Sequence, residues 1–172
     1  GKVAGVEIVA ILAWLSVLGI GLRVRSETLG LEHFEALPDE ELPGISVIIA
    51  ARDEERVVEA ALRSLVELDY PELEIVFVDD RSADRTGEIA RALSQSHPRG
   101  ERLKVLTCRE LPSGWLGKLH ALHLGTRAAT KSLILLTDAD VVFEGDSLKR
   151  AASAQKILKA DHLAVSPLIE TD

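Results

Sequence analysis

The sequence predicts an α/β domain with a mainly parallel, Rossmann-like sheet and helices on both faces, preceded by one transmembrane helix. Two observations predict the domain: short apolar runs rich in β-branched residues alternate with helical patterns, and acidic side chains follow several of these runs. A third observation, an apolar stretch near the amino terminus, predicts the membrane span. At 172 residues the chain is long enough for one domain with its own core and an appendage.

The predicted span is the apolar stretch from Val3 to Leu22, in which Glu7 is the only charged residue. At ~1.5 Å per residue, a helix of this length crosses a ~30 Å hydrocarbon layer. A cleaved signal peptide and a buried core helix are the alternatives, and the length of the stretch favours a membrane anchor over residues 1–24. Arg23 and Arg25 follow it, so the positive-inside rule places the domain on the cytoplasmic side of a bacterial-type inner membrane.

The folded domain is expected over residues 44–172, after an acidic linker over residues 25–43. Strands are predicted over residues 45–50, 73–79, 103–107, 133–138 and 162–167, and helices over residues 57–68, 84–94, 116–129 and 147–158. Crossovers of this kind are right-handed, so the strands run parallel and helices cover both faces of the sheet. Ligands of such sheets bind beyond the carboxyl ends of the strands, and the function should therefore be sought there.

Composition narrows the classes of function. The chain carries 20 basic and 28 acidic residues, a net charge of −8, which argues against a protein that grips nucleic-acid phosphates. Cys108 is the only cysteine, which excludes an intramolecular disulfide and a cysteine zinc cluster. An anionic ligand must therefore be met by local groups or through a metal.

Acidic residues follow three of the predicted strands. The first strand runs into AARDEE, the second into the pair at residues 79–80, and the fourth into Asp-Ala-Asp at residues 138–140. Two adjacent carboxylates at a strand end repel each other unless a cation or a hydrogen-bond donor lies between them, so the pair is predicted to contact a ligand. Asp53 and either Ser82 or Asp84 have a simpler interpretation as helix caps, worth about 1 kcal/mol each.

Asp138 and Asp140 form a D-x-D pattern, which is predicted to hold Mg²⁺ or Mn²⁺. In an extended chain the two side chains project to one side, with α-carbons roughly 6.5 Å apart. Carboxylate oxygens are the ligands that these cations prefer, and diphosphate oxygens can fill the remaining positions. A bare D-x-D is common by chance, but its placement after a buried strand strengthens the prediction.

The segment LPSGWLGKLHALHLG, residues 111–125, is a second candidate for ligand contact. Lys118 stands in the first turn of a predicted helix, and nearby glycines allow close approach, which suits a phosphate; the alternative is a solvated lysine. Trp115 either packs over the ligand or fills the loop, and both interpretations stay open. His120 and His123 could share a metal, although histidines at this spacing more often pack or form hydrogen bonds.

These segments together resemble the family 2 glycosyltransferases. ISVIIAARDEE, IVFVDDRSADRT, GWLGKLHAL and LILLTDADVVF occur in the order and spacing of that family and cover most of residues 45–143. The GWLGK segment and the preceding span are most similar to the hopene-associated glycosyltransferases and other enzymes with lipid acceptors. The resemblance implies a GT-A fold, of which this sequence would be the amino-terminal, nucleotide-sugar-binding part.

The resemblance also implies roles for single residues. Strand one would border the nucleotide, Asp79 or Asp80 would read the base, expected to be uracil, and Lys118 would approach the diphosphate. Ala139 occupies the variable centre of the metal pattern. The residues implied for nucleotide-sugar binding are Ala50, Arg52, Glu54, Asp79, Asp80, Lys118 and Asp138, and those implied for the metal are Asp138 and Asp140.

The implied reaction is a metal-assisted, inverting transfer of a sugar from a nucleotide-diphosphate donor, expected to be a UDP-sugar, to a lipid or polyprenoid-like acceptor. The implied partners are that donor, that acceptor and a membrane, with no nucleic acid. An enzyme carboxylate takes the acceptor proton in this chemistry. Glu170 and Asp172 lie too close to the last predicted strand for that role, so the base is expected beyond Asp172.

Three other functions are weighed against this one. A phosphoacceptor receiver module should carry its acidic pair after the first strand, whereas residues 79–80 follow the second. A nucleotidyltransferase should have a glycine-rich loop with a lysine after strand one, where this chain has AARDEE. A membrane-tethered nucleotide-sugar-binding domain without catalysis stays open on the sequence alone.

Overall fold

The computed structural model describes residues 30–166, and the chain divides into two compact units, residues 1–33 and residues 34–172. The described part of the first unit is a single 3-10 turn, η1 (Leu31–His33). The membrane span predicted over residues 3–22 lies outside the described residues. Within the described part of the chain, no helix is long and apolar enough to cross a membrane.

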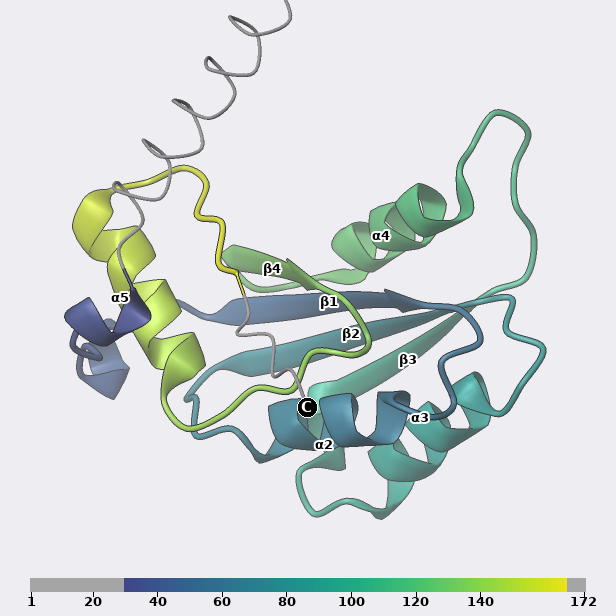
Figure 1. Cartoon of the computed structure of the whole chain (residues 1–172), viewed down its shortest axis with the longest axis horizontal. Helices are drawn as coiled ribbons and strands as arrows, with labels where there is room; N and C mark the ends of the chain where they lie inside the picture. The colour runs from purple at the N-terminus through teal and green to yellow at the C-terminus, as the bar shows by residue number, and fades with distance from the viewer. Residues whose placement is uncertain (1–29, 167–172) are drawn as a thin grey trace, which may run out of the picture. The chain divides into compact units, whose positions relative to one another are not determined.

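The second unit is built on a parallel sheet of four strands in the order β3-β2-β1-β4 (Figure 1). The strands are β1 (Ile45–Ala51), β2 (Leu73–Asp80), β3 (Leu103–Cys108) and β4 (Leu133–Thr137). β1 and β2 occupy the centre, and their continuous apolar runs are buried on both faces, as expected for the middle of a parallel sheet. The four strands predicted over residues 45–138 are therefore confirmed.

Helices cover both faces of this sheet, as predicted (Figure 1). The helices are α2 (Val58–Glu67), α3 (Thr86–Ser96), α4 (Gly117–Ala128) and α5 (Ser147–Leu158). α2, α3 and α5 contribute to one core, and α4 alone packs on the opposite face of β1 and β2. Gly125 lets α4 lie close to the sheet, because a Cβ at this position would overlap the Ile48 side chain.

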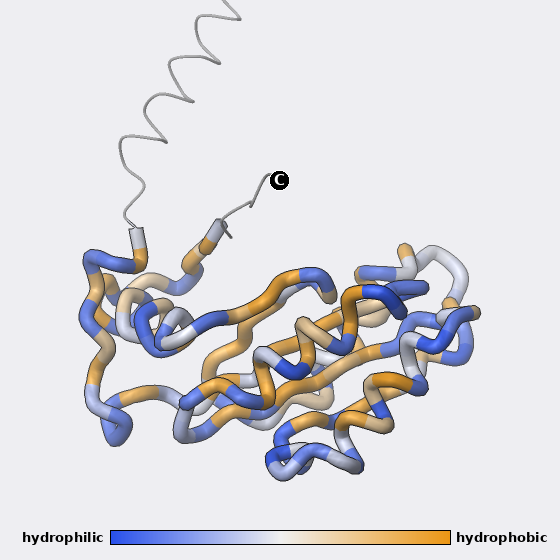
Figure 2. The backbone as a smooth tube through the Cα atoms, turned by 60° about the horizontal axis from the view of Figure 1, so that its bottom comes forward, coloured by the Kyte–Doolittle hydropathy of each residue, from blue (hydrophilic) through white to orange (hydrophobic). Residues whose placement is uncertain are grey.

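Side chains of the central strands alternate between the two cores. Val47, Ile49 and Phe77 face the core under α2 and α3, whereas Ile48 and Val78 face α4. Figure 2 shows these strands as apolar stretches of the backbone, with hydrophilic stretches concentrated in the loops and on the outer faces of the helices. The same alternation decides the direction of the acidic residues at the strand ends.

Within the second unit, residues 37–43 ahead of β1 contact α5 and the residues that precede β2. A 3-10 turn, η2 (Asp39–Glu41), lies beside α5, and the Lys149 ammonium contacts Asp39 Oδ1 at 2.8 Å. The Leu37 backbone N–H donates to Ser153 Oγ at 2.9 Å. Further on, the Tyr70 hydroxyl donates to the Pro43 carbonyl at 2.6 Å, which ties this segment to the β2 side of the sheet.

The strand predicted over residues 162–167 is wrong for the residues that the structure describes. Residues 162–166 form no strand, and Leu163 and Val165 are exposed. β-branched and apolar residues favour a pleated, half-buried surface, but a strand also needs a neighbour for its backbone hydrogen bonds. This segment pairs with no strand of the described sheet.

Candidate functional site

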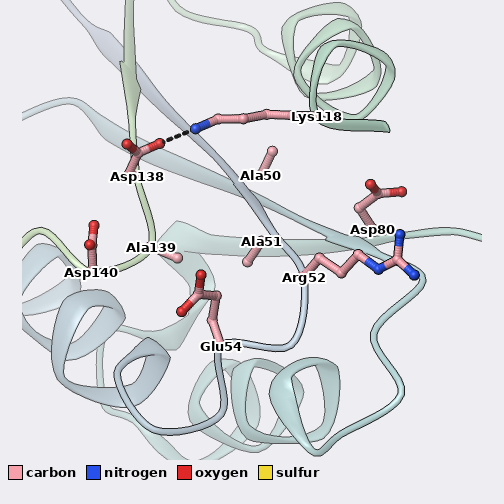
Figure 3. Close-up of a pocket in the computed structure, with 9 residues that line it drawn as sticks. All are labelled: Ala50, Ala51, Arg52, Glu54, Asp80, Lys118, Asp138, Ala139 and Asp140. Carbon is pink, nitrogen blue, oxygen red and sulfur yellow. Dashed lines mark hydrogen bonds and ion pairs between the residues drawn. The ribbon is translucent and has the colours of Figure 1, made fainter. Parts of the chain in front are cut away.

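The carboxyl ends of β1, β2 and β4 and the start of α4 surround an open pocket of about 280 Å³ (Figure 3). All of the residues predicted to contact the ligand line this pocket except Asp79. The lining comprises Ala50, Ala51, Arg52, Glu54, Asp80, Lys118, Asp138, Ala139 and Asp140. The volume lies near the lower end for ligand pockets, roughly 300 Å³.

Parallel pairing brings these residues together from distant parts of the chain. Ala51 is level with Asp79 across the β1–β2 pair, and Ile49 is level with Thr137 across the β1–β4 pair. Because the strands run in the same direction, whatever follows each of them lies at the same edge of the sheet. This register is the reason that carboxylates from two strands and a lysine from a helix face one pocket.

Asp79 and Asp80 point in opposite directions because they are neighbours on a strand. Asp80 lies on the α4 side, where it lines the pocket. Asp79 lies on the α3 side and accepts a hydrogen bond from the Ser82 backbone N–H at 3.1 Å. The structure thus separates the two members of the pair that the sequence left as alternatives.

Asp80 is held by Arg81, the residue that follows it. Arg81 Nε donates to Asp80 Oδ1 at 2.8 Å and Nη2 donates to Oδ2 at 3.1 Å, a two-point contact that fixes the carboxylate plane. The Asp80 side chain is only 6% exposed and that of Arg81 is 26% exposed. These hydrogen bonds from Arg81 keep the pKa of Asp80 below its ordinary value although burial opposes them. Asp80 is therefore a pre-positioned anion at the pocket wall.

Two glycines make room for the buried carboxylates. A Cβ at Gly117, the first residue of α4, would lie 2.6 Å from Asp80 Oδ2 and 2.8 Å from Arg81 Nη2. A Cβ at Gly87 in α3 would overlap the Asp79 carboxylate. Arg81, Gly87 and Gly117 were not predicted as site residues. For Gly117, the only available signal was its position between Leu116 and the predicted phosphate-binding lysine.

The other side of the pocket carries the D-x-D pattern. Asp138 and Asp140 are exposed, and the Ala139 side chain between them is buried in the core under α2. Asp138 turns toward α4, where Lys118 Nζ contacts its Oδ1 at 2.6 Å (Figure 3). The loop that follows is tied to α2, because the Phe143 backbone N–H donates to Ser64 Oγ at 3.0 Å.

The interpretation of Asp53 as a helix cap is wrong. The first helix, α2, has Val57 as its cap residue without a side-chain hydrogen bond. Asp53 has a left-handed backbone, φ 56°, and its carboxylate accepts from the Ala83 N–H in the next loop at 2.7 Å. Its own N–H donates to Ser82 Oγ at 3.1 Å, so the two residues lock the loops after β1 and β2 together.

Asp84 was predicted as a helix cap, but the cap residue of α3 is Arg85; Asp84 lies one residue earlier and still accepts a backbone N–H of the first turn. Its Oδ1 accepts from the backbone N–H of Thr86, the first residue of the helix, at 2.9 Å. Its Oδ2 accepts from the Glu55 N–H at 3.1 Å, and Thr86 Oγ1 in turn accepts from the Glu54 N–H at 2.8 Å. These bonds set the position of Glu54, whose side chain reaches the pocket.

Trp115 and the two histidines of α4 pack against one another. The Trp115 ring lies 5.3 Å from the His120 ring and 5.1 Å from the His123 ring, measured between centroids. His120 Nδ1 also lies 3.4 Å from the Cys108 sulfur. This arrangement supports the interpretation that the histidines pack, and it places Trp115, in the loop ahead of α4, against that helix.

The residues of the pocket suit a hard divalent cation whose remaining coordination positions are filled by groups other than protein side chains. Asp138 already accepts an ammonium group at 2.6 Å, so its carboxylate is placed to hold a cation. Among residues 30–166, no group of three or more His, Cys, Asp or Glu side chains could hold a metal by itself. A cation at Asp138 and Asp140 would therefore complete its shell with oxygens of a ligand or of water.

The fold and pocket define a class of protein: a doubly wound α/β domain whose carboxyl edge offers carboxylates for a divalent cation beside a lysine suited to phosphate. The sequence model described as Glycosyl transferase family 2 matches residues 46–169. The chain belongs to this family of glycosyltransferases. The family assignment confirms the resemblance to the family 2 glycosyltransferases and excludes the receiver module and the nucleotidyltransferase.

Known proteins similar to the chain include a curated synthase and two proteins of solved structure. Beta-monoglucosyldiacylglycerol synthase of Trichormus variabilis is 29% identical over 147 residues, which cover 80% of this chain and 30% of that relative. Mannosyltransferase PcManGT of Pyrobaculum calidifontis, solved in complex with GDP-Man and Mn²⁺, has a TM-score of 0.61 and 31% identity, covering 71% of this chain and 35% of that one. TarS of S. aureus, solved with UDP-GlcNAc, has a TM-score of 0.57 and 30% identity, and the match covers 69% of this chain and 32% of that one. The chain spans less than a third of the length of the curated relatives it matches.

Proposed function

We propose that the pocket binds a nucleoside-diphosphate sugar, with uridine as the nucleoside, together with Mg²⁺ or Mn²⁺. The reaction is the inverting transfer of the sugar to a lipid or polyprenoid-like acceptor. One observation carries the proposal: Asp80, Lys118 and Asp138 come from three different elements and line a single pocket at the carboxyl edge of the sheet.

The nucleoside lies on the β2 side of the pocket in this proposal. Asp80 reads the base, since its carboxylate lines the pocket and Arg81 holds it in the ionised form. Ala50, Arg52 and Glu54 border the nucleotide along the end of β1 and the loop after it. Asp79 supports this wall from behind through the Ser82 N–H and does not contact the ligand.

The diphosphate and the sugar lie on the β4 side. Lys118 faces the diphosphate from the first turn of α4, where the helix amino terminus also favours an anion. Asp138 and Asp140 hold the divalent cation, which neutralises charge on the departing nucleoside diphosphate. The tie between Phe143 and Ser64 keeps the loop after these carboxylates against the domain.

Relatives support the donor, the cation and the acceptor class. PcManGT was solved with GDP-Man and Mn²⁺, and TarS with UDP-GlcNAc. The Trichormus relative is a diacylglycerol glycolipid synthase by name, in keeping with a lipid acceptor. The similarity of GWLGK to the hopene-associated enzymes narrows this proposal to a hopanoid or related polyprenoid lipid. The apolar residues 3–22 supply the proposed anchor in the cytoplasmic membrane.

Binding of UDP to the purified protein, measured by calorimetry with and without Mn²⁺, tests the proposal. We expect Mn²⁺ to strengthen UDP binding, and Asp140→Ala to remove this strengthening, a loss of at least ~100-fold in affinity for the cation complex. Asp161→Ala is the matched control, since it removes an exposed carboxylate outside the pocket. UDP binding that is the same with and without Mn²⁺ would contradict the proposal, and a panel of nucleotides then tests the choice of uridine.

A further inference from the structure

The geometry points to Lys118 as an exchangeable cation of the pocket: its ammonium holds Asp138 before a ligand binds and moves to the donor diphosphate when Asp138 takes the divalent cation. The inference rests on the proposed function for the identity of cation and donor. It adds a coupling between the binding of the divalent cation and that of the donor, because Asp138 cannot give the same oxygen fully to both Lys118 and the divalent cation.

The contact itself is the first step of the argument. Lys118 Nζ lies 2.6 Å from Asp138 Oδ1, and the two residues stand on different elements that meet at the pocket. Figure 3 shows the lysine side chain extended across the pocket toward the carboxylate. The ammonium thus occupies an oxygen that the D-x-D pattern would offer to a metal.

The exposure of this ion pair makes the exchange easy. The side chains of Lys118 and Asp138 are 62% and 60% exposed, and ion pairs in contact with water contribute little net stability. A second acid–base pair at the pocket wall, Asp80 with Arg81, is largely buried and held at two points. Of these two pairs, the one at the D-x-D pattern is therefore the one that a ligand can open at low cost.

Charge then couples the two ligands. A divalent cation at Asp138 repels the Lys118 ammonium, which needs another anion nearby. The diphosphate of the donor supplies that anion, and its oxygens supply the ligands that Asp138 and Asp140 do not provide. Each ligand therefore raises the affinity of the other, and by linkage the coupling is the same in both directions.

Lysine is suited to this role in a way that arginine is not. Its ammonium is a point charge on a flexible stem, so it can leave one oxygen and reach another by rotamer changes. Arginine prefers a two-point contact with a carboxylate in one plane, as Arg81 makes with Asp80. We therefore expect Lys118→Arg to hold Asp138 more firmly than the native residue does.

The test measures Mn²⁺ binding without nucleotide, from the electron paramagnetic resonance signal of unbound Mn²⁺, at fixed ionic strength. We expect Lys118→Met to raise the affinity for Mn²⁺ alone by roughly 2- to 5-fold, as for loss of an exposed competing ion pair. The same variant should bind UDP in the presence of Mn²⁺ about 10-fold more weakly, because a charged contact to phosphate is lost. A rise in the affinity for Mn²⁺ alone together with a fall in the affinity for UDP identifies the exchange.

Two variants serve as controls. Arg52→Met removes a positive charge from the same pocket without touching the Lys118–Asp138 contact, and Lys118→Arg keeps the charge and the contact. Affinity for Mn²⁺ alone should rise only in Lys118→Met. An equal rise in Arg52→Met, or no rise in Lys118→Met with an unchanged melting temperature, overturns the exchange. Failure of the proposed function is seen separately, as UDP binding to the native protein that does not depend on Mn²⁺.

Discussion

The two sides of the pocket hold their carboxylates in different ways. At the end of β2, Asp80 is 4% exposed, lies in a strand with neighbours on both sides, and is gripped by Arg81. At the end of β4, an edge strand of the described sheet, pairing stops at Thr137 and Asp138 extends beyond it with an exposed lysine as its partner.

The difference indicates a division of labour between the two sides. A group that reads a base by hydrogen bonding benefits from being fixed in advance, because little ordering is then required when the ligand binds. A group that shares a cation with a ligand must be able to change partners. The central strand provides the first property, and the edge strand provides the second.

The largest expected difference between the two sides of the pocket is in the free energy of unfolding. Asp80→Ala leaves the partly buried Arg81 guanidinium without its carboxylate and should lower the free energy of unfolding by about 2 kcal/mol. Asp138→Ala removes an exposed partner and should change it by less than about 0.5 kcal/mol. Urea denaturation of both variants measures the contrast, and equal losses would show that the two sides are alike.

The next effect concerns the fixed position of Asp80. Gly117→Ala places a methyl group where the Asp80 carboxylate and the Arg81 guanidinium lie, so it should displace both and weaken UDP binding about 10-fold. Leu116→Ala is the neighbouring control, because its side chain is 71% exposed. Calorimetry on the two variants checks this, and equal affinities would mean that the precise placement of Asp80 is unimportant.

The smallest effect is a dependence of stability on pH. Because Arg81 keeps the pKa of Asp80 below its ordinary value, the folded state binds this proton more weakly than the unfolded chain does. The stabilisation is therefore complete above the unfolded pKa of about 3.9 and is lost as the pH falls through the lower folded pKa. Asp80→Asn should be less stable than the native protein at pH 7, and the difference should shrink as the pH falls below about 4. A difference that stays constant down to pH 2 would assign the effect to packing.

Much of this site could be predicted from the sequence because its position follows from the topology of a parallel sheet. Apolar runs fixed the strands, and residues after the runs had to meet at one edge, which placed Asp80, Asp138 and Lys118 together. On the sequence alone Asp79 and Asp80 formed one pair, and which of them reads the base stayed open, because the face that carries the pocket depends on where α4 packs. That is a tertiary property.

The predictions that were wrong, and a residue that was overlooked, also have physical reasons that depend on tertiary structure. Asp53 looked like a cap because its residue type favours caps, whereas its left-handed backbone turns the carboxylate toward the next loop. The strand expected over residues 162–167 had suitable residues but no partner in the described sheet. Gly117 matters through the space beside Asp80, and a sequence contains no record of such space.

The hydrogen bond from Tyr70 to the Pro43 carbonyl gives the protein an internal optical probe. Tyr70 is the only tyrosine in the chain, and burial raises the pKa of its hydroxyl to about 12. Free tyrosine ionises near pH 10, so between these values the phenol stays neutral in the folded protein and ionises in the unfolded chain. Between about pH 10 and pH 12, the ultraviolet absorbance of tyrosinate therefore reports the opening of the junction between the segment ahead of β1 and the sheet, without any added label.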